Sequence, residues 1–249
     1  MRLPDKVSLI TGGARGLGLT MAERFVAEGA RVLIVDRERA QGEQVAASLS
    51  ARGASVHFVP ADLAYPDMIA HAIDAALSLE GRLDILVNNA AVILPKGIEE
   101  TSASEWDWLM SINLRAPFLM VKAALPALKA SRGVILNIGS TTGLRATPHN
   151  VAYSVSKAGV IMMTRDLARD LHPFGIRVNC LCPGAIDTPL LHAHVTALGG
   201  GEEVLERTRS RGLLTTPQQI AEVALYLVSD EASAITGSVV VADAGAILF

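Results

Sequence analysis

The sequence predicts a single α/β domain in which a doubly wound parallel sheet of about seven strands is covered by helices on both faces. Short, nearly continuous apolar runs alternate with longer amphipathic patterns along the whole chain. Strands buried on both faces of a parallel sheet have this composition, whereas half-exposed antiparallel strands alternate polar and apolar residues. No internal repeat and no Pro/Gly/Ser-rich linker divides residues 1–249, so we expect one folding unit.

The predicted elements follow one another regularly. Strands are expected over Val7–Thr11, Arg31–Asp36, Ser55–Pro60, Asp84–Val87, Val134–Gly139, Ile176–Cys182 and Ser238–Val241. Helices are expected over Leu17–Glu28, Arg37–Ala51, Pro66–Glu80, Glu105–Ala130, Ala152–Leu171 and Pro217–Ser229. Pro117 should kink or break the fourth helix, because proline has no N–H to donate. The irregular segment at about 186–212, with three consecutive glycines and the charged helical piece Glu202–Arg209, is interpreted as a lid over a site.

The composition argues against several classes of protein. A net charge of −3 without blocks of like charge offers no basic surface for nucleic acid. The N-terminal apolar run ends at Thr11 and is too short for a secretory signal, and no apolar stretch is long enough to span a bilayer. Cys180 and Cys182 lie two apart on a predicted strand, which indicates two buried apolar side chains and neither a disulfide framework nor a metal motif. We expect a soluble, cytoplasmic protein without a metal site.

A glycine-rich turn joins the first predicted strand to the first predicted helix. Gly12, Gly16 and Gly18 allow a tight turn and a close approach of phosphate oxygens, and the helix N-terminus offers free N–H groups. The spacing is not the strict G-x-G-x-x-G of the general dinucleotide fingerprint, but the strand–turn–helix context agrees with it. The turn therefore predicts a dinucleotide site.

The end of the second strand indicates which dinucleotide is bound. Asp36 lies there, where a carboxylate can accept hydrogen bonds from the adenosine ribose and repel a 2′-phosphate. Arg15 and Arg37 could each hold such a phosphate, but repulsion by Asp36 should outweigh them. NAD is favoured over NADP.

Tyr153 and Lys157 are four residues apart in a predicted helix, which places both side chains on one face about a turn apart. A free tyrosine has a pKa of about 10. A cation beside it favours the phenolate and brings its pKa toward the working range of a general acid/base. The pair is common in proteins, so its meaning depends on the rest of the chain.

Two further motifs supply that context. Asn88-Asn89-Ala90-Ala91 follows the fourth strand, and Ser140 follows the fifth. With the glycine turn, Asp36 and the Tyr153/Lys157 pair, their order and spacing resemble the short-chain dehydrogenase/reductase family over essentially the whole chain. The resemblance implies a Rossmann-type fold, a nicotinamide cofactor and hydride transfer between carbon and nicotinamide.

The resemblance also implies four catalytic residues. Tyr153 would exchange a proton with the substrate oxygen, and Ser140 would hydrogen-bond the same oxygen. Lys157 would bind the nicotinamide ribose and lower the pKa of Tyr153. Asn113 would support a water chain from Lys157 to solvent. Acyl transfer by Ser140 is discounted, because the chain has no Gly-x-Ser-x-Gly elbow and no histidine placed to serve it.

The cofactor residues implied by the resemblance come from several loops. Asp62 would bond the adenine amino group, Asn89 and Ala90 would line the adenosine ribose, and Thr188 would reach the carboxamide or the pyrophosphate. The full set is Gly12, Arg15, Gly16, Leu17, Gly18, Asp36, Arg37, Asp62, Leu63, Asn89, Ala90, Ala91, Tyr153, Lys157, Pro183, Gly184, Ile186 and Thr188. Ala91 and the run Asp243-Ala244-Gly245 depart from the family, which often has glycine at the two alanines, and we expect only a small change in the backbone.

The substrate is less well defined by the sequence. Arg145 and His149 follow Ser140, and we hypothesise that they face the pocket and that Arg145 binds an anionic or polyhydroxylated substrate; a solvated surface arginine is the alternative. His192 and His194 have no third ligand at a suitable spacing, so a metal role is not expected.

The resemblance implies a homotetramer, and the apolar tail at residues 246–249 is expected to pack on a neighbouring subunit. Three functions remain open. The first is an NAD-dependent dehydrogenase of secondary alcohols, such as polyols or hydroxysteroid-like compounds. The second is an NADPH-dependent 3-oxoacyl-thioester ketoreductase, and the third is a dinucleotide-binding sensor or scaffold without catalysis.

Overall fold

A seven-stranded parallel sheet forms the centre of the molecule, as predicted. The computed structural model describes residues 1–248. The sheet has the strand order β3-β2-β1-β4-β5-β6-β9, and every neighbouring pair is parallel. Its strands are β1 Val7–Thr11, β2 Arg31–Asp36, β3 Val56–Pro60, β4 Ile85–Asn88, β5 Val134–Ile138, β6 Arg177–Pro183 and β9 Val239–Ala242. Each lies within one or two residues of its predicted position.

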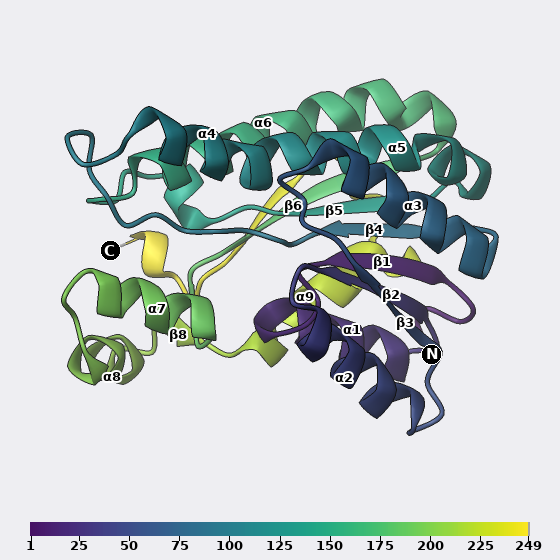
Figure 1. Cartoon of the computed structure of the whole chain (residues 1–249), viewed down its shortest axis with the longest axis horizontal. Helices are drawn as coiled ribbons and strands as arrows, with labels where there is room; N and C mark the ends of the chain where they lie inside the picture. Colours follow the sequence, from purple (N-terminus) through teal and green to yellow (C-terminus); the bar gives the residue numbers. More distant parts are fainter. Residues whose placement is uncertain (249) are drawn as a thin grey trace.

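Helices cover both faces of this sheet (Figure 1). One layer contains α1 Gly16–Ala27, α2 Arg39–Ser50 and α9 Pro217–Val228. The other contains α3 Pro66–Glu80, α4 Ala103–Met110, α5 Ala116–Ser131 and α6 Val151–Leu171. Apolar side chains from the strands pack against each layer in a separate buried cluster, which explains why the strands are apolar on both faces.

The break expected near Pro117 is a π-helical turn, Ser111–Arg115, between α4 and α5. Pro117 itself is the second residue of α5, where a missing N–H costs little. Such turns often occur at functional sites. This one carries Asn113.

The predicted lid is mostly helical. It contains α7 Pro189–Ala197 and α8 Glu202–Ser210, which form a lobe beside the sheet in Figure 1. Two short parallel strands, β7 Ala185–Ile186 and β8 Leu214–Thr215, pair at its two ends. The lid therefore has a hydrogen-bonded base.

Cys180 and Cys182 lie on β6 with both thiols completely buried, as predicted. They are free cysteines with their sulfur atoms 3.7 Å apart. A side chain at Gly139 would place its Cβ only 2.6 Å from the sulfur of Cys182 and 2.7 Å from that of Cys180. The two thiols thus pack beneath the end of β5, where Ser140 begins the next turn.

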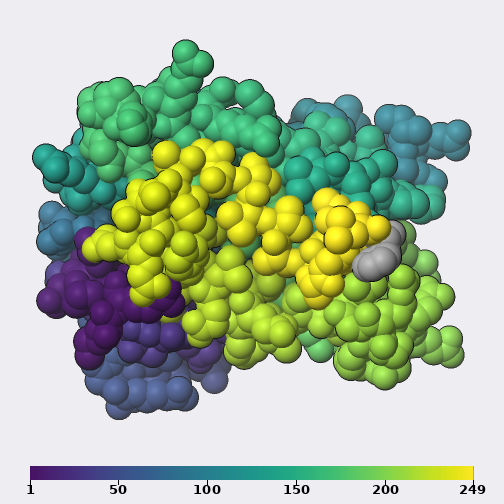
Figure 2. Space-filling view, turned by 180° about the vertical axis from the view of Figure 1, so that it is seen from behind, coloured from purple at the N-terminus to yellow at the C-terminus, as the bar shows by residue number. Residues whose placement is uncertain are grey.

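The C-terminal segment after β9 runs back across the molecule toward α7 and α8 (Figure 2). It ends in a 3₁₀ turn at Ala246–Leu248. Within residues 1–248, no helix combines the length and the apolar character needed to cross a membrane.

Candidate active site

A cavity of about 480 Å³ lies where the carboxyl ends of the strands meet the lid. This is the edge at which ligands bind in open parallel sheets. The predicted cofactor residues all line it, and Ser140 lines it with them. Asn113, Arg145 and His149 do not.

The glycine turn forms one wall of the cavity with little free space behind it. Gly12 has a φ of +67°, and a Cβ there would lie 2.9 Å from the Cα of Ala90. A Cβ at Gly18 would lie 2.1 Å from the carbonyl oxygen of Gly12. A Cβ at Gly16, where φ is +56°, would lie 3.7 Å from the side chain of Thr188. Glycine at Gly12 and Gly18 thus lets the turn pack closely on itself and on the loop after β4, and the turn leads into the N-terminus of α1, where a pyrophosphate can bind.

Asp36 lies at the end of β2 and lines the cavity. Its Oδ2 accepts the N–H of Ala14 at 3.1 Å, and its Oδ1 accepts the N–H of Glu38 at 3.2 Å. A carboxylate has about four acceptor positions, so two remain for ribose hydroxyls. Arg37 is turned to the Glu38 carboxylate, 3.3 Å from its Nε.

The loop after β4 is fixed to the glycine turn. Thr11 Oγ1 accepts the N–H groups of Asn89 and Ala90, each at 3.0 Å, and the Asn89 side chain donates to the carbonyls of Thr11 and Gly12. These bonds hold Ala90 and Ala91 against the cavity. Asp62 lines the far end, where its carboxylate accepts the N–H of Ala64 at 2.9 Å.

Ser140, Tyr153 and Lys157 meet at the inner end of the cavity, although Ser140 follows β5 and the other two residues lie on α6. Ser140 Oγ accepts hydrogen bonds from the backbone N–H of Thr142 at 3.2 Å and from its hydroxyl at 3.0 Å. Because a hydroxyl has two acceptor positions and one proton, Ser140 is left with its proton to donate into the cavity. Lys157 Nζ donates to the Ile138 carbonyl at 2.7 Å and lies 5.7 Å from the centre of the Tyr153 ring.

Burial controls the protonation of this pair. It raises the pKa of Tyr153 to about 12, although the Ser140 hydroxyl beside it acts in the opposite direction. Burial also lowers the pKa of Lys157 to about 8, because the residue is only 3% exposed. The pKa of Tyr153 is therefore raised, whereas the family resemblance implies that Lys157 lowers it. The physical reason is that the phenol is removed from water, while Lys157 donates one of its protons to a backbone carbonyl.

Asn113 braces the cavity from behind. Its Oδ1 accepts the N–H of Val92 at 2.8 Å, and its Nδ2 donates to the Val92 carbonyl at 2.8 Å and to Ser156 Oγ at 3.2 Å. The π-helical turn thus ties the loop after β4 to helix α6, which carries Tyr153 and Lys157.

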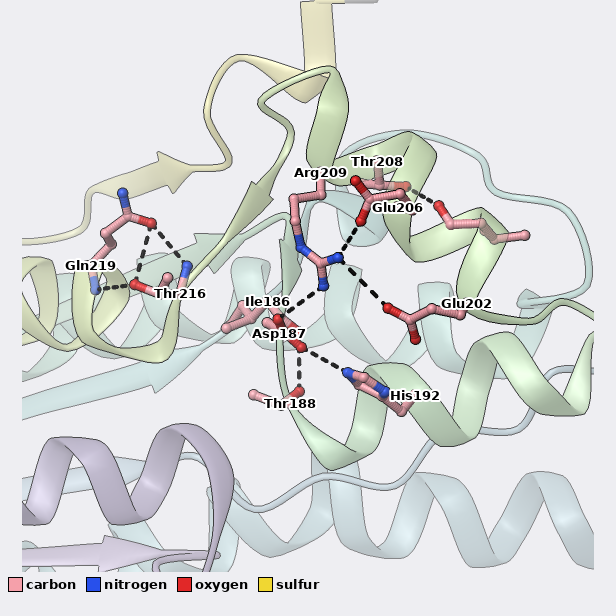
Figure 3. Close-up of polar contacts among 11 residues, drawn as sticks. Ile186, Asp187, Thr188, His192, Glu202, Glu206, Thr208, Arg209, Thr216 and Gln219 are labelled. Carbon is pink, nitrogen blue, oxygen red and sulfur yellow. Dashed lines mark hydrogen bonds and ion pairs between the residues drawn. The ribbon is translucent and has the colours of Figure 1, made fainter.

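A polar network joins the two lid helices (Figure 3). Asp187, between β7 and α7, accepts a hydrogen bond from His192 at 2.7 Å and an ion pair from Arg209 of α8 at 3.5 Å. Arg209 also pairs with Glu206 and Glu202 of its own helix. The hydrogen bond from His192, and to a smaller extent the ion pair with Arg209, holds the pKa of the Asp187 carboxyl below its usual range.

Arg145 and His149 lie outside the cavity, contrary to the hypothesis that they face the substrate. Arg145 Nη1 donates to the Ala246 carbonyl at 2.9 Å and so holds the C-terminal segment. His149 occupies a turn with a φ of +53°. Ala244, at the second departure from the family, has a φ of +53°, a region that favours glycine.

Several cavity residues have no counterpart among the predicted ones. Five of them are apolar and four are polar; these residues are Val92, Ile93, Thr142, Thr147, Asn150, Leu190, Leu191, Ala193 and His194. Asn150 could have been found from its position three residues before Tyr153. The residues of α7 gave no signal, because the segment was interpreted as a loop.

Comparisons with known proteins agree with this geometry. A family model described as enoyl-(acyl carrier protein) reductase matches residues 12–246. The chain is similar to a cyclopentanol dehydrogenase of a Comamonas species (strain NCIMB 9872), with 39% identity over 245 residues and 98% of both chains covered. It is 40% identical over 240 residues to a 2,5-dichloro-2,5-cyclohexadiene-1,4-diol dehydrogenase of Sphingobium indicum, covering 95% of this chain and 94% of that one. Among solved structures, the 3-ketoacyl-(acyl-carrier-protein) reductase from Brucella melitensis complexed with NADH has a TM-score of 0.89, 37% identity and 98% of both chains covered.

Proposed function

The chain belongs to the short-chain dehydrogenase/reductase family of oxidoreductases that act on CH–OH groups, and from this premise we propose that it uses NAD to interconvert a cyclic secondary alcohol and its ketone. The observation that carries the choice of cofactor is Asp36, whose carboxylate retains free acceptor positions inside the cavity. The ring-shaped substrate is suggested by the names of two relatives, which act on cyclopentanol and on a cyclohexadiene diol.

The cavity residues supply positions for each part of the dinucleotide. Asp36 would accept the ribose hydroxyls, the turn at Gly12–Gly18 would hold the pyrophosphate, and Asp62 would bond the adenine. Lys157 has two ammonium protons left after its bond to Ile138, which suits the hydroxyls of the nicotinamide ribose. When bound, the nicotinamide supplies the carbon that accepts or gives the hydride.

Proton transfer would be the task of Tyr153, with Ser140 orienting the substrate oxygen. In the direction of oxidation Tyr153 must be deprotonated, and burial opposes this by raising its pKa. We therefore expect kcat/KM for alcohol oxidation to increase with pH above neutrality. Reduction needs the protonated phenol and should not show this increase. Asn113 has a positioning role, through Val92 and α6, and the water chain implied by the resemblance remains part of the proposal.

A second candidate, thioester ketoreduction with NADPH, is favoured by the similarity to the Brucella reductase alone. That structure is described as complexed with NADH, which does not support a preference for NADPH. The third reading, a sensor without catalysis, has no supporting observation, since Tyr153, Lys157 and Ser140 converge on one cavity.

We also propose that the protein is a cytoplasmic homotetramer. Large apolar side chains on the outer surfaces of α4, α5 and α6 are substantially exposed in one copy of the chain, namely Trp108, Phe118, Val155 and Met162. Deleting residues 246–249 should weaken assembly; an unchanged tetramer by light scattering would argue against a contribution of the tail, whose last residue lies outside the described residues.

The test is turnover of NAD or NADP with cyclic alcohols, open-chain alcohols and 3-hydroxyacyl thioesters, using the wild type beside Tyr153→Phe. We expect activity with cyclic alcohols and NAD that disappears in the variant, while NADH binding, followed by fluorescence, persists. Activity confined to NADP and thioesters would establish the ketoreductase instead. NADH binding without turnover of any of these compounds would favour the sensor.

A further inference from the structure

The substrate end of the cavity combines apolar side chains with several polar groups that could recognise a substituent of the substrate. The loop after β4 contributes Val92 and Ile93, and helix α7 contributes Leu190 and Leu191. The polar exceptions on these walls, apart from the catalytic residues, are Thr141, Thr142, Thr147, Asn150 and His194. A polar group buried in such a place normally has a hydrogen-bond partner.

Two of these residues depart from that rule: Asn150 Oδ1 and His194 Nδ1 are buried without a hydrogen-bond partner among residues 1–248, and Asn150 is the nearer of the two in sequence to Tyr153. Asn150 immediately precedes α6, three residues before Tyr153, and is 2% exposed. Its Nδ2 donates to the Pro148 carbonyl at 3.0 Å, whereas its Oδ1 is buried and has no partner among residues 1–248. The side chain also makes no capping bond to the helix that it precedes.

The orientation of this amide is determined by its surroundings. The Pro148 carbonyl can only accept, so a rotated amide would place two oxygens against each other and lose the bond. Its backbone carbonyl accepts the N–H of Ser154 at 2.8 Å, which fixes the residue at the start of α6. Asn150 therefore presents a held acceptor beside the catalytic tyrosine.

A buried acceptor such as Asn150 Oδ1 favours a bound molecule that carries a hydrogen-bond donor. A hydroxyl of a bound molecule satisfies Oδ1, whereas a carboxylate repels it. The cationic residues that line the cavity are Arg15, Arg37 and Lys157; the first two lie on the glycine-turn and Asp36 side, and Lys157 is bonded to Ile138. His194 on α7 is kept neutral at pH 7, because burial lowers its pKa. Apart from Lys157, which would hold the nicotinamide ribose, no cationic side chain within the described part of the chain meets an anionic substituent at this end.

We propose that Asn150 Oδ1 accepts a hydrogen bond from a second hydroxyl of the substrate, so that the enzyme prefers uncharged cyclic diols or hydroxyketones to the corresponding monoalcohols and hydroxy acids. The inference rests on the proposed dehydrogenase function and deepens it. Of the two substrate classes hypothesised for Arg145, it keeps the polyhydroxylated one and drops the anionic one, with Asn150 in place of Arg145.

The test compares cyclohexanol, the cyclohexane-1,2-, 1,3- and 1,4-diols, and 4-hydroxycyclohexanecarboxylate as substrates of the wild type, Asn150→Leu and Asn150→Ser. Wild-type kcat/KM should be at least about tenfold higher for one diol than for cyclohexanol, the size expected for one buried hydrogen bond. In Asn150→Leu this ratio should fall to about one, because only the diol loses a bond. Asn150→Ser keeps an acceptor of shorter reach and should retain part of the preference.

The control is NADH affinity, which should be unchanged in both variants, since Asn150 is not among the residues that would hold the cofactor. An equal loss for diol and monoalcohol in Asn150→Leu, or a wild-type preference for the carboxylate, would overturn the inference and leave the dehydrogenase function intact. Failure of the wild type to oxidise any alcohol would instead refute the proposed function, and with it the inference.

Discussion

Replacing Lys157 by methionine should stabilise the folded protein while abolishing turnover. Burial lowers the pKa of this lysine from 10.5 to about 8. At about 1.4 kcal/mol for each tenfold change in proton affinity, the buried ammonium costs the folded state about 3 kcal/mol at neutral pH. Methionine has a similar length and no charge, but its presence would leave the Ile138 carbonyl without this donor, at a cost of about 1 kcal/mol. The expected net gain is about 2 kcal/mol.

Thermal unfolding without cofactor measures this gain. For a chain of this size, about 2 kcal/mol corresponds to an increase in Tm of roughly 4–8 °C. Lys122→Met is the matched control, because Lys122 is exposed on α5 and should leave Tm nearly unchanged. Protein concentration must be equal in all samples, since assembly contributes to Tm.

The dependence on pH identifies the cause. Below pH 8 both the folded and the unfolded wild type carry the proton on Lys157, so the full cost is present. Between pH 8 and 10.5 the unfolded chain holds a proton that the folded state releases, and wild-type stability therefore gains with rising pH. The advantage of Lys157→Met should shrink through this range relative to the control. An advantage that is absent at pH 7, or that does not change between pH 8 and 10.5, would refute the reasoning.

Three further predictions concern the cofactor, the backbone and the lid. Asp36→Ala should raise kcat/KM with NADP and lower it with NAD, because it removes both the ribose acceptor and the repulsion of a 2′-phosphate. Ala244→Gly should increase the free energy of unfolding by up to about 1 kcal/mol in urea, since it relieves a φ of +53°. Asp187→Asn should weaken the contacts to His192 and Arg209 and accelerate hydrogen exchange in α7 and α8. In the wild type these contacts need the carboxylate, so they persist from neutral pH down to the lowered pKa of Asp187 and are lost below it.

Each prediction has a result that would contradict it. An unchanged preference for NAD in Asp36→Ala would mean that another residue reads the ribose. A less stable Ala244→Gly would show that the added freedom of the unfolded chain outweighs the strain. Equal exchange rates in the lids of wild type and Asp187→Asn would show that apolar contacts, and not the polar network, hold the two helices.

The strands and the glycine turn could be predicted from the sequence because their signals are local, whereas the roles of Ser140, Tyr153 and Lys157 were implied by the family resemblance. A buried parallel strand is a short apolar run. The β1–α1 turn requires glycine at Gly12 and Gly18, because a Cβ at either position would collide with neighbouring backbone atoms. The order of these motifs then brought Ser140 together with Tyr153 and Lys157. Their meeting in one cavity follows from the parallel topology.

Other features depended on long-range contacts and could not be predicted. The break in the helix at Pro117 was expected, but its form is a π-helical turn that is braced by Asn113 across the chain to Val92. Arg145 was hypothesised to face the pocket because it is close in sequence to Ser140, with a surface arginine as the alternative. The alternative is correct: Arg145 is exposed and bonds Ala246, 101 residues away. Helix α7 was interpreted as a loop because Pro189 and the glycines near residue 200 hid a nine-residue helical segment.

The burial of Cys180 and Cys182 makes the chain its own reporter of opening beneath the active site. They are the two cysteines of the sequence, and both thiols are buried beside the end of β5 and in one cluster with Val160 and Ile161 of α6. A thiol reagent in solution can label them only when this part of the core opens, so the labelling rate under native conditions measures how often the floor of the active site opens. Saturating dinucleotide should slow this labelling by a factor set by its concentration over its Kd. Affinity for candidate cofactors can thus be ranked without a substrate and without any introduced probe.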